Sequence, residues 1–349
     1  RDGALFLLGP DGGDERLLTD AVPVSWPAWS PDKSRIAFVS LAMDSLSGNA
    51  KLYTIDTNGE NLTELAQWVS PYSAPAWSPD GANLAYTSLA AFDGARERGT
   101  ISIHLLDIAS GRIEDLTGDL VSHAISPTWS PRGDRLAFIS QVTRNIPGDG
   151  LLHQESSLHL LTLVTGETRQ IANPRLGDAV RVSWSPAGDW LLIYGEYQGA
   201  WYETNSTSLH LLDVTTGALT DLNPAERQVS RPVWSPEGER FAYLEGQTAI
   251  LIRTLELDQR SYNVISPAAG YLTWAPDGGA LFVAAADSTS ASRLIALDGS
   301  APSQTALDLQ YDLSAQYGGP PQWSPPHRFA PPSPPTVSGT AFDLEGDGT

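Results

Sequence analysis

The histidines are the residues of this 349-residue chain best suited to acid–base or metal chemistry near neutral pH. Three of the six, His104, His159 and His210, stand at the same place in similar segments, where other copies have Tyr53 or Phe6. Tyrosine and phenylalanine do not titrate near neutrality. A place shared by all three residue types therefore favours a packing role over proton transfer.

The other three histidines lack the neighbours that catalysis or metal binding requires. His123, His153 and His327 have no carboxylate or second histidine at ligand spacing, so a site there would need partners from distant parts of the chain. Cysteine is absent, and the short motifs of serine hydrolases, zinc peptidases, phosphate-binding loops and dinucleotide-binding folds are missing. We therefore expect no catalytic residues and no cofactor within the repeats.

The acidic residues near the end of the sequence have the one spacing that suits a cation. Asp343, Glu345 and Asp347 stand two apart, and Gly348 follows. Calcium loops of the EF-hand type place oxygen ligands at positions 1, 3 and 5 and a glycine at position 6. The segment matches the opening half of such a loop and is a candidate calcium site. A solvated acidic tail explains the same residues, because the match covers only half of the loop.

A near copy of Trp-Ser-Pro-x-Gly occurs seven times and sets the architecture. Successive copies are 40–55 residues apart, which is the period of repeated supersecondary units. A large aromatic side chain at one fixed place in every unit predicts packing between neighbouring units. The repeated residues are Trp29, Trp77, Trp129, Trp184, Trp234, Trp274 and Trp323.

Each repeat predicts four antiparallel strands, which we name A, B, C and D. Strand A ends at the tryptophan, Ser-Pro-Asp-Gly forms a turn, and strand B is an apolar run such as residues 135–139. Strands C and D form a hairpin with an Asp-x-x-x-Gly or Thr-Gly turn, as in residues 208–221. Such sheets bury little alone, and when packed around an axis they form an all-β propeller.

The two ends of the chain each supply half a repeat. Residues 4–19 hold only strands C and D, and residues 322–330 hold only strands A and B. Pairing them predicts a seventh blade, closed 2+2 by the N- and C-terminal strands, which removes exposed strand edges; six blades are the alternative. The predicted propeller spans residues 1–330. Residues 331–349 form a proline-rich extended tail with one lone strand, which would pair with its own blade or with another molecule.

The block Trp-Ser-Pro-Asp-Gly-x-x-Leu-Ala-Phe, with its partner Leu-x-x-x-Asp-x-x-x-Gly, resembles the TolB-type propeller repeat across residues 1–330. Similar repeats occur in the propellers of prolyl-oligopeptidase-like peptidases. The resemblance implies the fold and is unspecific for function. TolB itself is a periplasmic interaction propeller, usually of six blades behind a separate domain. This sequence departs from that pattern, so the partners of TolB are not carried over.

Composition narrows the partners and the setting. The formal net charge of −20 repels a phosphate backbone, so we expect no nucleic-acid partner. No apolar run approaches the ~18 residues of a membrane-spanning helix, so we expect no transmembrane segment. Two lysines, one methionine, no cysteine and many prolines fit a harsh or extracellular setting. We therefore expect an extracytoplasmic protein, either secreted, at the cell surface or periplasmic.

The two faces of the predicted propeller should differ. The A–B and C–D turns share one face, and the B–C loops and D–A crossovers share the other, which we call the crossover face. Long B–C loops are predicted at residues 41–50, 89–100, 141–157 and 195–207. Long loops on a rigid scaffold often carry binding, and aromatic residues dominate interface hot spots. The predicted partner-binding residues are Trp68, Tyr72, Phe92, Tyr197, Trp201 and Tyr202.

These features favour a non-catalytic propeller that acts as a protein-interaction or self-assembly scaffold, with oligomers formed through the C-terminal tail. Two enzymatic readings stay open. The ring could be the regulatory propeller of a larger prolyl-oligopeptidase-like enzyme, which would need a neighbouring hydrolase domain. It could also be a propeller-top carbohydrate lyase or hydrolase, which would need histidines, arginines and carboxylates to converge from separate blades.

Overall fold

The structure is a computed structural model, and it describes most of the chain between residues 4 and 307. These ranges contain strands, turns and bends but no helix, so none of their elements is a helix that could cross a membrane. The all-β prediction is confirmed for this part of the chain. The described residues are 4–7, 16–40, 50–71, 73–89, 100–118, 120–121, 123–145, 152–172, 179–196, 207–223, 228–229, 232–245, 249–256, 259–263, 269–275, 277–285, 292–297 and 303–307.

The first strands form a two-stranded sheet and three four-stranded units. The N-terminal pair contains β1 (Leu5–Leu7) and β2 (Arg16–Thr19). Unit 1 contains β3 (Ser25–Trp29), β4 (Arg35–Ser40), β5 (Ala50–Asp56) and β6 (Thr63–Val69). Unit 2 contains β7 (Ala76–Trp77), β8 (Asn83–Leu89), β9 (Ile101–Asp107) and β10 (Ile113–Asp115). Unit 3 contains β11 (Ala124–Trp129), β12 (Arg135–Asn145), β13 (Leu152–Thr162) and β14 (Glu167–Ala172).

Three further units continue the same antiparallel order. Unit 4 contains β15 (Ala179–Trp184), β16 (Trp190–Glu196), β17 (Thr207–Asp213) and β18 (Leu219–Asp221). Unit 5 contains β19 (Val233–Trp234), β20 (Arg240–Glu245), β21 (Ala249–Thr254) and β22 (Gln259–Asn263). Unit 6 contains β23 (Ala269–Trp274), β24 (Ala280–Ala285), β25 (Ser292–Ala296) and β26 (Ser303–Leu307).

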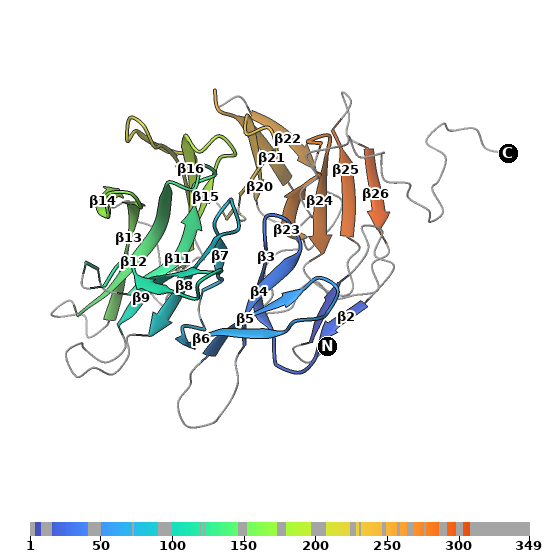
Figure 1. The fold of residues 1–349 in the computed structure, drawn as a ribbon. Coiled ribbons are helices and arrows are strands. Elements are labelled where there is room, and N and C mark those ends of the chain that lie inside the picture. The colour runs from blue at the N-terminus through green and yellow to red at the C-terminus, as the bar shows by residue number, and fades with distance from the viewer. Residues whose placement is uncertain are drawn as a thin grey trace.

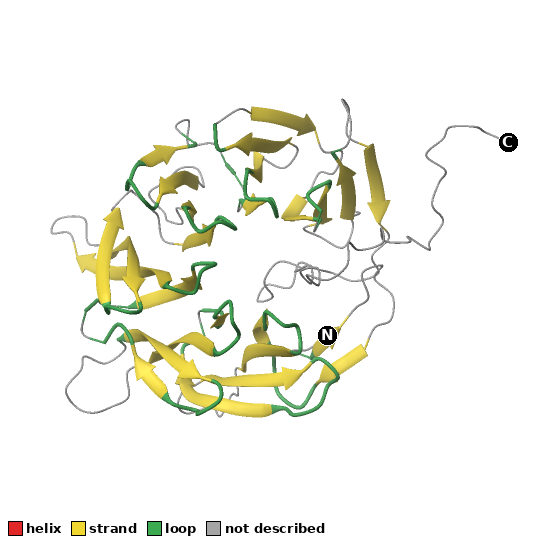
Figure 2. Ribbon diagram, turned by 45° about the horizontal axis from the view of Figure 1, so that its top comes forward, coloured by secondary structure: helices red, strands yellow, loops and turns green. Residues whose placement is uncertain are grey.

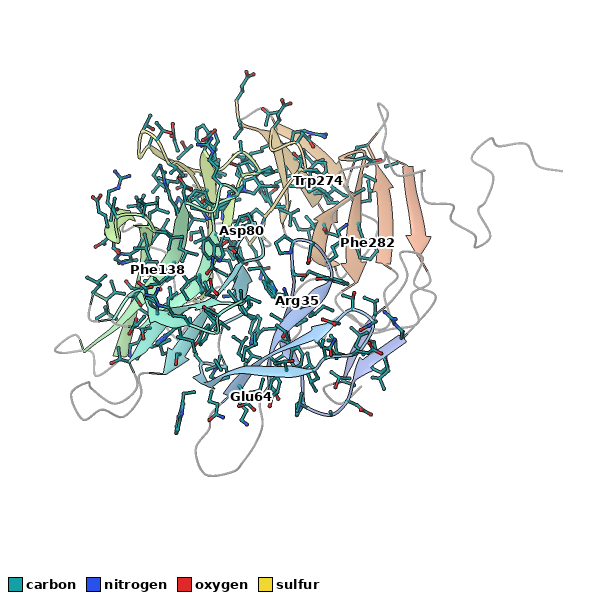
Figure 3. All side chains as sticks on the ribbon, in the orientation of Figure 1. Arg35, Glu64, Asp80, Phe138, Trp274 and Phe282 are labelled. Atoms are coloured by element: carbon teal, nitrogen blue, oxygen red, sulfur yellow. The ribbon has the colours of Figure 1, made fainter. Side chains whose placement is uncertain are left out.

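The units lie around a common centre with their A strands innermost (Figures 1 and 2). Contacts between successive A strands, from β3 to β7 and onward to β23, form the inner ring. Figure 3 shows the radial order, with Glu64 on β6 at the rim and Arg35 at the start of β4 nearer the centre. Each A strand begins after a D–A crossover and ends at its tryptophan, just before the A–B turn. Its first residues therefore lie at the crossover face, and its tryptophan lies toward the opposite face, which we call the turn face.

The turns between strands A and B form as the repeat predicts. In unit 2 the backbone N–H of Gly81 donates to the Ser78 carbonyl, and the Ser78 hydroxyl donates to Asp80 at 2.6 Å. Gly81 has a φ of 71°, a conformation that L side chains rarely adopt. The Ser78 hydrogen bond holds the pKa of Asp80 below its usual value. The acidic residue after Ser-Pro therefore serves the turn.

The repeated tryptophans link each unit to the one before it. In the described part of the chain, five indole N–H groups of the series donate to the carbonyl of the residue that precedes the tryptophan of the previous unit. A buried or half-buried donor is satisfied each time, so the same bond fixes the spacing of successive A strands. The five bonds join Trp77 to Ala28, Trp129 to Ala76, Trp184 to Thr128, Trp234 to Ser183 and Trp274 to Val233, at 2.9–3.2 Å.

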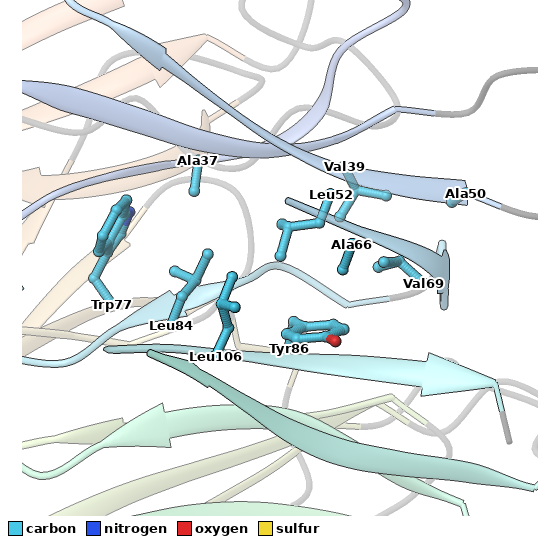
Figure 4. Packing of buried hydrophobic residues seen from close by; sticks show 10 residues of the cluster. All are labelled: Ala37, Val39, Ala50, Leu52, Ala66, Val69, Trp77, Leu84, Tyr86 and Leu106. Atoms are coloured by element: carbon cyan, nitrogen blue, oxygen red, sulfur yellow. The ribbon is translucent and has the colours of Figure 1, made fainter. Parts of the chain in front are cut away.

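Apolar residues fill the space between neighbouring units. Between units 1 and 2, Trp77 and Leu84 face Ala37 and Leu52 across the interface (Figure 4). Comparable buried clusters lie between each later pair of units. The core is therefore divided among the interfaces, and no single unit encloses it.

The N-terminal pair packs on unit 1 as strands C and D of a preceding unit would. Leu5 and Leu18 join Ile36, Phe38 and Ile55 in one buried cluster. The prediction that residues 4–19 supply a C–D hairpin agrees with this packing. The predicted A and B strands at residues 322–330 and the tail at residues 331–349 lie outside the described residues.

Two details differ from the repeat pattern. Units 1 and 2 share one sheet, because Val69 at the end of β6 pairs with Ser88 of β8, beyond the two-residue strand β7. The loop predicted at residues 141–157 is instead largely strand. β12 and β13 stay paired as far as Asn145 and Leu152, because this segment alternates without an early turn residue.

Candidate functional site

Trp68 is the one predicted partner-binding residue within the described ranges. It lies near the end of β6, next to the crossover into unit 2, and 51% of its surface is exposed. An exposed indole is the kind of group that anchors protein interfaces. The other predicted residues, Tyr72, Phe92, Tyr197, Trp201, Tyr202, Asp343, Glu345 and Asp347, lie outside the described residues.

A β-bulge sets the direction of Trp68. Ala50 pairs with Val69 and Leu52 pairs with Ala66, so β6 carries one residue more than β5 over this stretch. Trp68 has a φ of 62°, and the Ser88 hydroxyl donates to its carbonyl at 3.0 Å. Bulges re-aim side chains, and a left-handed backbone is costly for a bulky residue. The strand therefore holds an exposed tryptophan in a conformation that it would not adopt unaided.

A second tryptophan is bulged in the same way near the centre of the ring. Trp26 of β3 has a φ of 54°, and its indole N–H donates to the Pro71 carbonyl at 2.9 Å. The guanidinium carbon of Arg181 on β15 lies 5.9 Å from the centre of the Trp26 ring, within the range of a cation–π contact. This contact joins units 1 and 4, which are not neighbours along the chain.

A serine contact joins units 2 and 3. Ser126 of β11 sits in a bulge with a φ of 54°, and its backbone N–H donates to the hydroxyl of buried Ser73 at 3.1 Å. We call Trp26, Ser73, Ser126 and Arg181 the axial cluster. Its members come from four successive units and lie at the crossover ends of the A strands.

Backbone strain is concentrated on the crossover face. Six non-glycine residues have positive φ, counted over the described ranges. Strained residues cost about 1–3 kcal/mol each and are often found at functional sites, so the crossover face is the candidate functional face. Two of the six, Lys33 and Asn61, lie in turns on the opposite face, and four, Trp26, Trp68, His123 and Ser126, lie on the crossover face or the bulges that lead to it.

The strand C histidines show packing geometry rather than a catalytic relay. Both the Ser102 hydroxyl, at 3.2 Å, and Asp115, at 4.0 Å, approach the same Nε2 atom of His104. A relay needs the serine and the carboxylate at opposite ring nitrogens. His159 stacks on Phe138 with ring centres 5.1 Å apart, and burial lowers its pKa.

His210 also has a lowered pKa because of burial, although Asp221 opposes the shift. In the described part of the chain, no three histidine, aspartate or glutamate residues gather as a metal site would require.

Sequence reasoning missed the axial cluster, and no local pattern pointed to it. Three of its members, Trp26, Ser126 and Arg181, stand three residues before a repeated tryptophan, but Ser73 stands four residues before Trp77. The residues around this position also vary from repeat to repeat, so the position does not stand out in the sequence.

The inner A strands, the four-stranded units and the tryptophan series match a known family. The sequence model of the TolB beta propeller domain matches residues 42–326. The chain belongs to this family. The resemblance found in the Trp-Ser-Pro-Asp-Gly repeats is thereby confirmed.

Proteins similar to this TolB-family chain include enzymes. Dipeptidyl-peptidase 5 of Porphyromonas gingivalis is 26% identical over 121 residues, which are 34% of this chain and 17% of the peptidase. The match to a structure from a study of two prolyl endopeptidases covers 87% of this chain and 46% of the endopeptidase chain. The two are 16% identical, and the TM-score is 0.61. The match to oligogalacturonate lyase from Vibrio parahaemolyticus covers 86% of this chain and 81% of the lyase chain. The two are 12% identical, and the TM-score is 0.56. Both structural likenesses concern the fold, and the chain spans less than half of either peptidase.

Proposed function

We propose that this chain is a non-catalytic, extracytoplasmic interaction propeller whose crossover face binds a protein partner or another copy of the chain. One observation carries the proposal: the exposed indole of Trp68 and the strained axial cluster share that face. The turn face, by contrast, consists of short turns of repeated design. A rigid scaffold with one irregular, aromatic face suits partner binding.

The proposal includes a closed ring of seven units. The packing of β1 and β2 on unit 1 supports a preceding unit, for which residues 322–330 would supply strands A and B. Trp29 continues the tryptophan series, and no acceptor for its indole N–H lies within the described residues. The carbonyl of Gln322, next to Trp323, would be that acceptor. Closure would leave no inner strand edge open to other chains.

Partner capture from an extracytoplasmic extract of the source organism tests the function. The immobilised full chain is compared with Trp68→Ala and with Val164→Ala, whose side chain is 90% exposed in a turn of the opposite face. Loss of a hot-spot tryptophan weakens binding at least about tenfold, and the Val164 variant should bind normally. Equal capture by all three proteins, with unchanged unfolding midpoints, would contradict the role of this face.

Self-assembly through the tail has its own test. Removal of residues 331–349 should lower the mass measured by light scattering if the lone strand pairs with another molecule. An unchanged mass would rule out assembly through the tail and leave a partner of another kind.

A second candidate is the regulatory propeller of a larger peptidase. The 121-residue match to dipeptidyl-peptidase 5 favours it, since that match is one of sequence. A serine hydrolase domain with a Gly-x-Ser-x-Gly motif, encoded in the same gene, would be required. Peptidase activity of the full gene product, abolished by replacing that serine, would establish this role; a gene without the motif would exclude it.

A further inference from the structure

One place on strand C faces one place on strand D in each of units 1 to 4. The strand C residue is a tyrosine or a histidine, and the strand D residue is a carboxylate in every one of these units except unit 3, which has an uncharged glutamine. Side chains directly opposite one another on antiparallel strands lie close enough to interact. The four pairs are Tyr53 with Glu64, His104 with Asp115, His159 with Gln170 and His210 with Asp221.

The carboxylates of units 2 and 4 lie within reach of the histidine that they face. In unit 2 an Asp115 oxygen lies 4.0 Å from Nε2 of His104, and in unit 4 an Asp221 oxygen lies 3.9 Å from Nδ1 of His210. Aspartate generally stays ionised at the pH values at which histidine takes up its proton. A proton on either histidine therefore meets a negative charge at ion-pair distance.

His159 of unit 3 lies among uncharged groups. Its side chain is 7% exposed, and its ring stacks on Phe138 with the ring centres 5.1 Å apart. The Ser140 hydroxyl lies 2.8 Å from its Nε2 atom, and the amide of Gln170 donates to the Ser157 hydroxyl at 3.4 Å. A proton on His159 would therefore place a charge in a packed site without an opposite charge beside it.

The interface with unit 2 adds no compensating charge. His159 faces that unit, because Leu161 on the same side of β13 lies in the buried cluster between units 2 and 3. The acidic residues on this side of β9 and β10 are Asp107 and Glu114, and both are bonded within their own C–D turn.

The other charged residues of unit 3 are distant from His159 or lie on the opposite side of the sheet. Along β13, the next charged residue on the same side is Glu155, about 13 Å away. β11, on the inner side of β12, contains no titratable residue. The side of the sheet that faces unit 4 carries the charged strand residues Arg135, Glu167 and Arg169.

The difference between units 3 and 4 has a direction. Burial alone lowers the pKa of His159, whereas Asp221 opposes the same shift at His210. A lowered pKa in the folded state means that the opened chain binds the proton more readily. The stability that neutral His159 contributes is therefore complete above pH 6.5 and is lost as the pH falls toward the folded value. The loss falls on the strand pair that holds Phe138 in the cluster between units 2 and 3.

We propose that unit 3 is an acid-sensitive joint of the propeller, which loosens from unit 2 when His159 takes up a proton opposite Gln170. Units 2 and 4 stay closed over the same pH range, because Asp115 and Asp221 meet the charge at the equivalent place. Local opening of one unit ahead of the others is a normal property of repeat folds, whose stability is a sum over units and interfaces. The inference goes beyond the proposed function, because it needs no partner.

Hydrogen–deuterium exchange of the full chain at pH 7 and pH 5 tests the inference. Exchange is read by mass spectrometry and corrected for its intrinsic dependence on pH, and residues 158–172 of unit 3 are compared with residues 209–221 of unit 4. Gln170→Glu gives unit 3 the carboxylate of its neighbours, and Asp221→Asn removes the carboxylate of unit 4. The matched control is Arg169→Gln, which changes the charge by the same amount on the other side of β14.

In the wild type, acidification should lower the protection of the unit 3 segment more than that of the unit 4 segment. The fall should reach up to about tenfold per pH unit between the folded and unfolded pKa values of His159, because one proton is taken up on opening. Gln170→Glu should remove most of this excess, and Arg169→Gln should leave it unchanged. Asp221→Asn should give unit 4 the response of unit 3.

Equal losses of protection in the two wild-type segments, or a larger loss in unit 4, would overturn the inference. An excess loss in unit 3 that persists undiminished in Gln170→Glu would also overturn it. The comparison of the two segments uses wild-type protein, so the test holds even if a variant does not fold.

Discussion

Replacing Trp129 with phenylalanine should destabilise the protein by about 2–4 kcal/mol. The change removes the 2.9 Å hydrogen bond to Ala76, and an unpaired acceptor at a packed interface costs about 1–3 kcal/mol. The smaller ring also leaves a void where a side chain only 9% exposed had packed, which adds about 1 kcal/mol. The same bond recurs in five units, so we expect a loss of similar size at each of these five tryptophans.

Denaturant unfolding followed by far-ultraviolet circular dichroism measures this effect. Trp68→Phe is the matched control, because Trp68 is 51% exposed. This substitution should change the free energy of unfolding by less than about 0.5 kcal/mol. The m-value should stay constant if unfolding remains cooperative. Equal effects of the two substitutions, or a loss below about 0.5 kcal/mol for Trp129→Phe, would refute the claim that the indole bonds hold neighbouring units together.

Two further predictions follow from the turns and the buried histidines. Gly238→Ala should destabilise the protein more than Gly217→Ala does. The backbone strain is similar in both variants, because the two φ values are 80° and 75°. The new methyl group would lie 3.1 Å from Pro186 of the preceding unit at position 238, whereas it would meet nothing within 4 Å at position 217. Equal losses in denaturant midpoint would show that the contact between turns is unimportant. The lowered pKa of His159 means that the unfolded chain binds the proton more readily, so its contribution to stability is complete above pH 6.5 and is lost as the pH falls below that value. His159→Tyr should therefore reduce the slope of unfolding free energy between pH 7 and 5, and an unchanged slope would contradict the assignment.

The sequence predicted the units well because their signals are local. Ser-Pro-Asp-Gly defines a turn through the φ restrictions of proline and glycine, and the alternating runs on either side define strands. The indole of Trp129 was expected at an interface between units, and it lies there. Local patterns also allowed the N-terminal hairpin to be recognised as half of a unit, since Leu5 and Leu18 keep the apolar places of strands C and D.

The axial cluster could not be derived in the same way. Trp26 and Arg181 approach each other only because the units curve into a ring, and no local spacing records that curvature. The bulges at Trp26 and Ser126 are likewise set by tertiary contacts, because neither residue favours positive φ. The merging of units 1 and 2 depends on the pairing of Val69 with Ser88, a contact between units that the repeat alignment did not reveal.

Closure of the ring by the two ends of the chain is tested most directly by a cysteine pair. The chain has no cysteine, so Gly9→Cys with Arg328→Cys reports one contact without background. By repeat position this pair corresponds to Arg135 and Thr162, which face each other in unit 3. The positive control is therefore the variant in which Arg135 and Thr162 are both replaced by cysteine. We predict an intramolecular disulfide on mild oxidation for both pairs and none for Gly9→Cys with Arg112→Cys. A disulfide in the unit 3 control alone, or one that joins two molecules through Gly9 and Arg328, would contradict a ring closed within one chain.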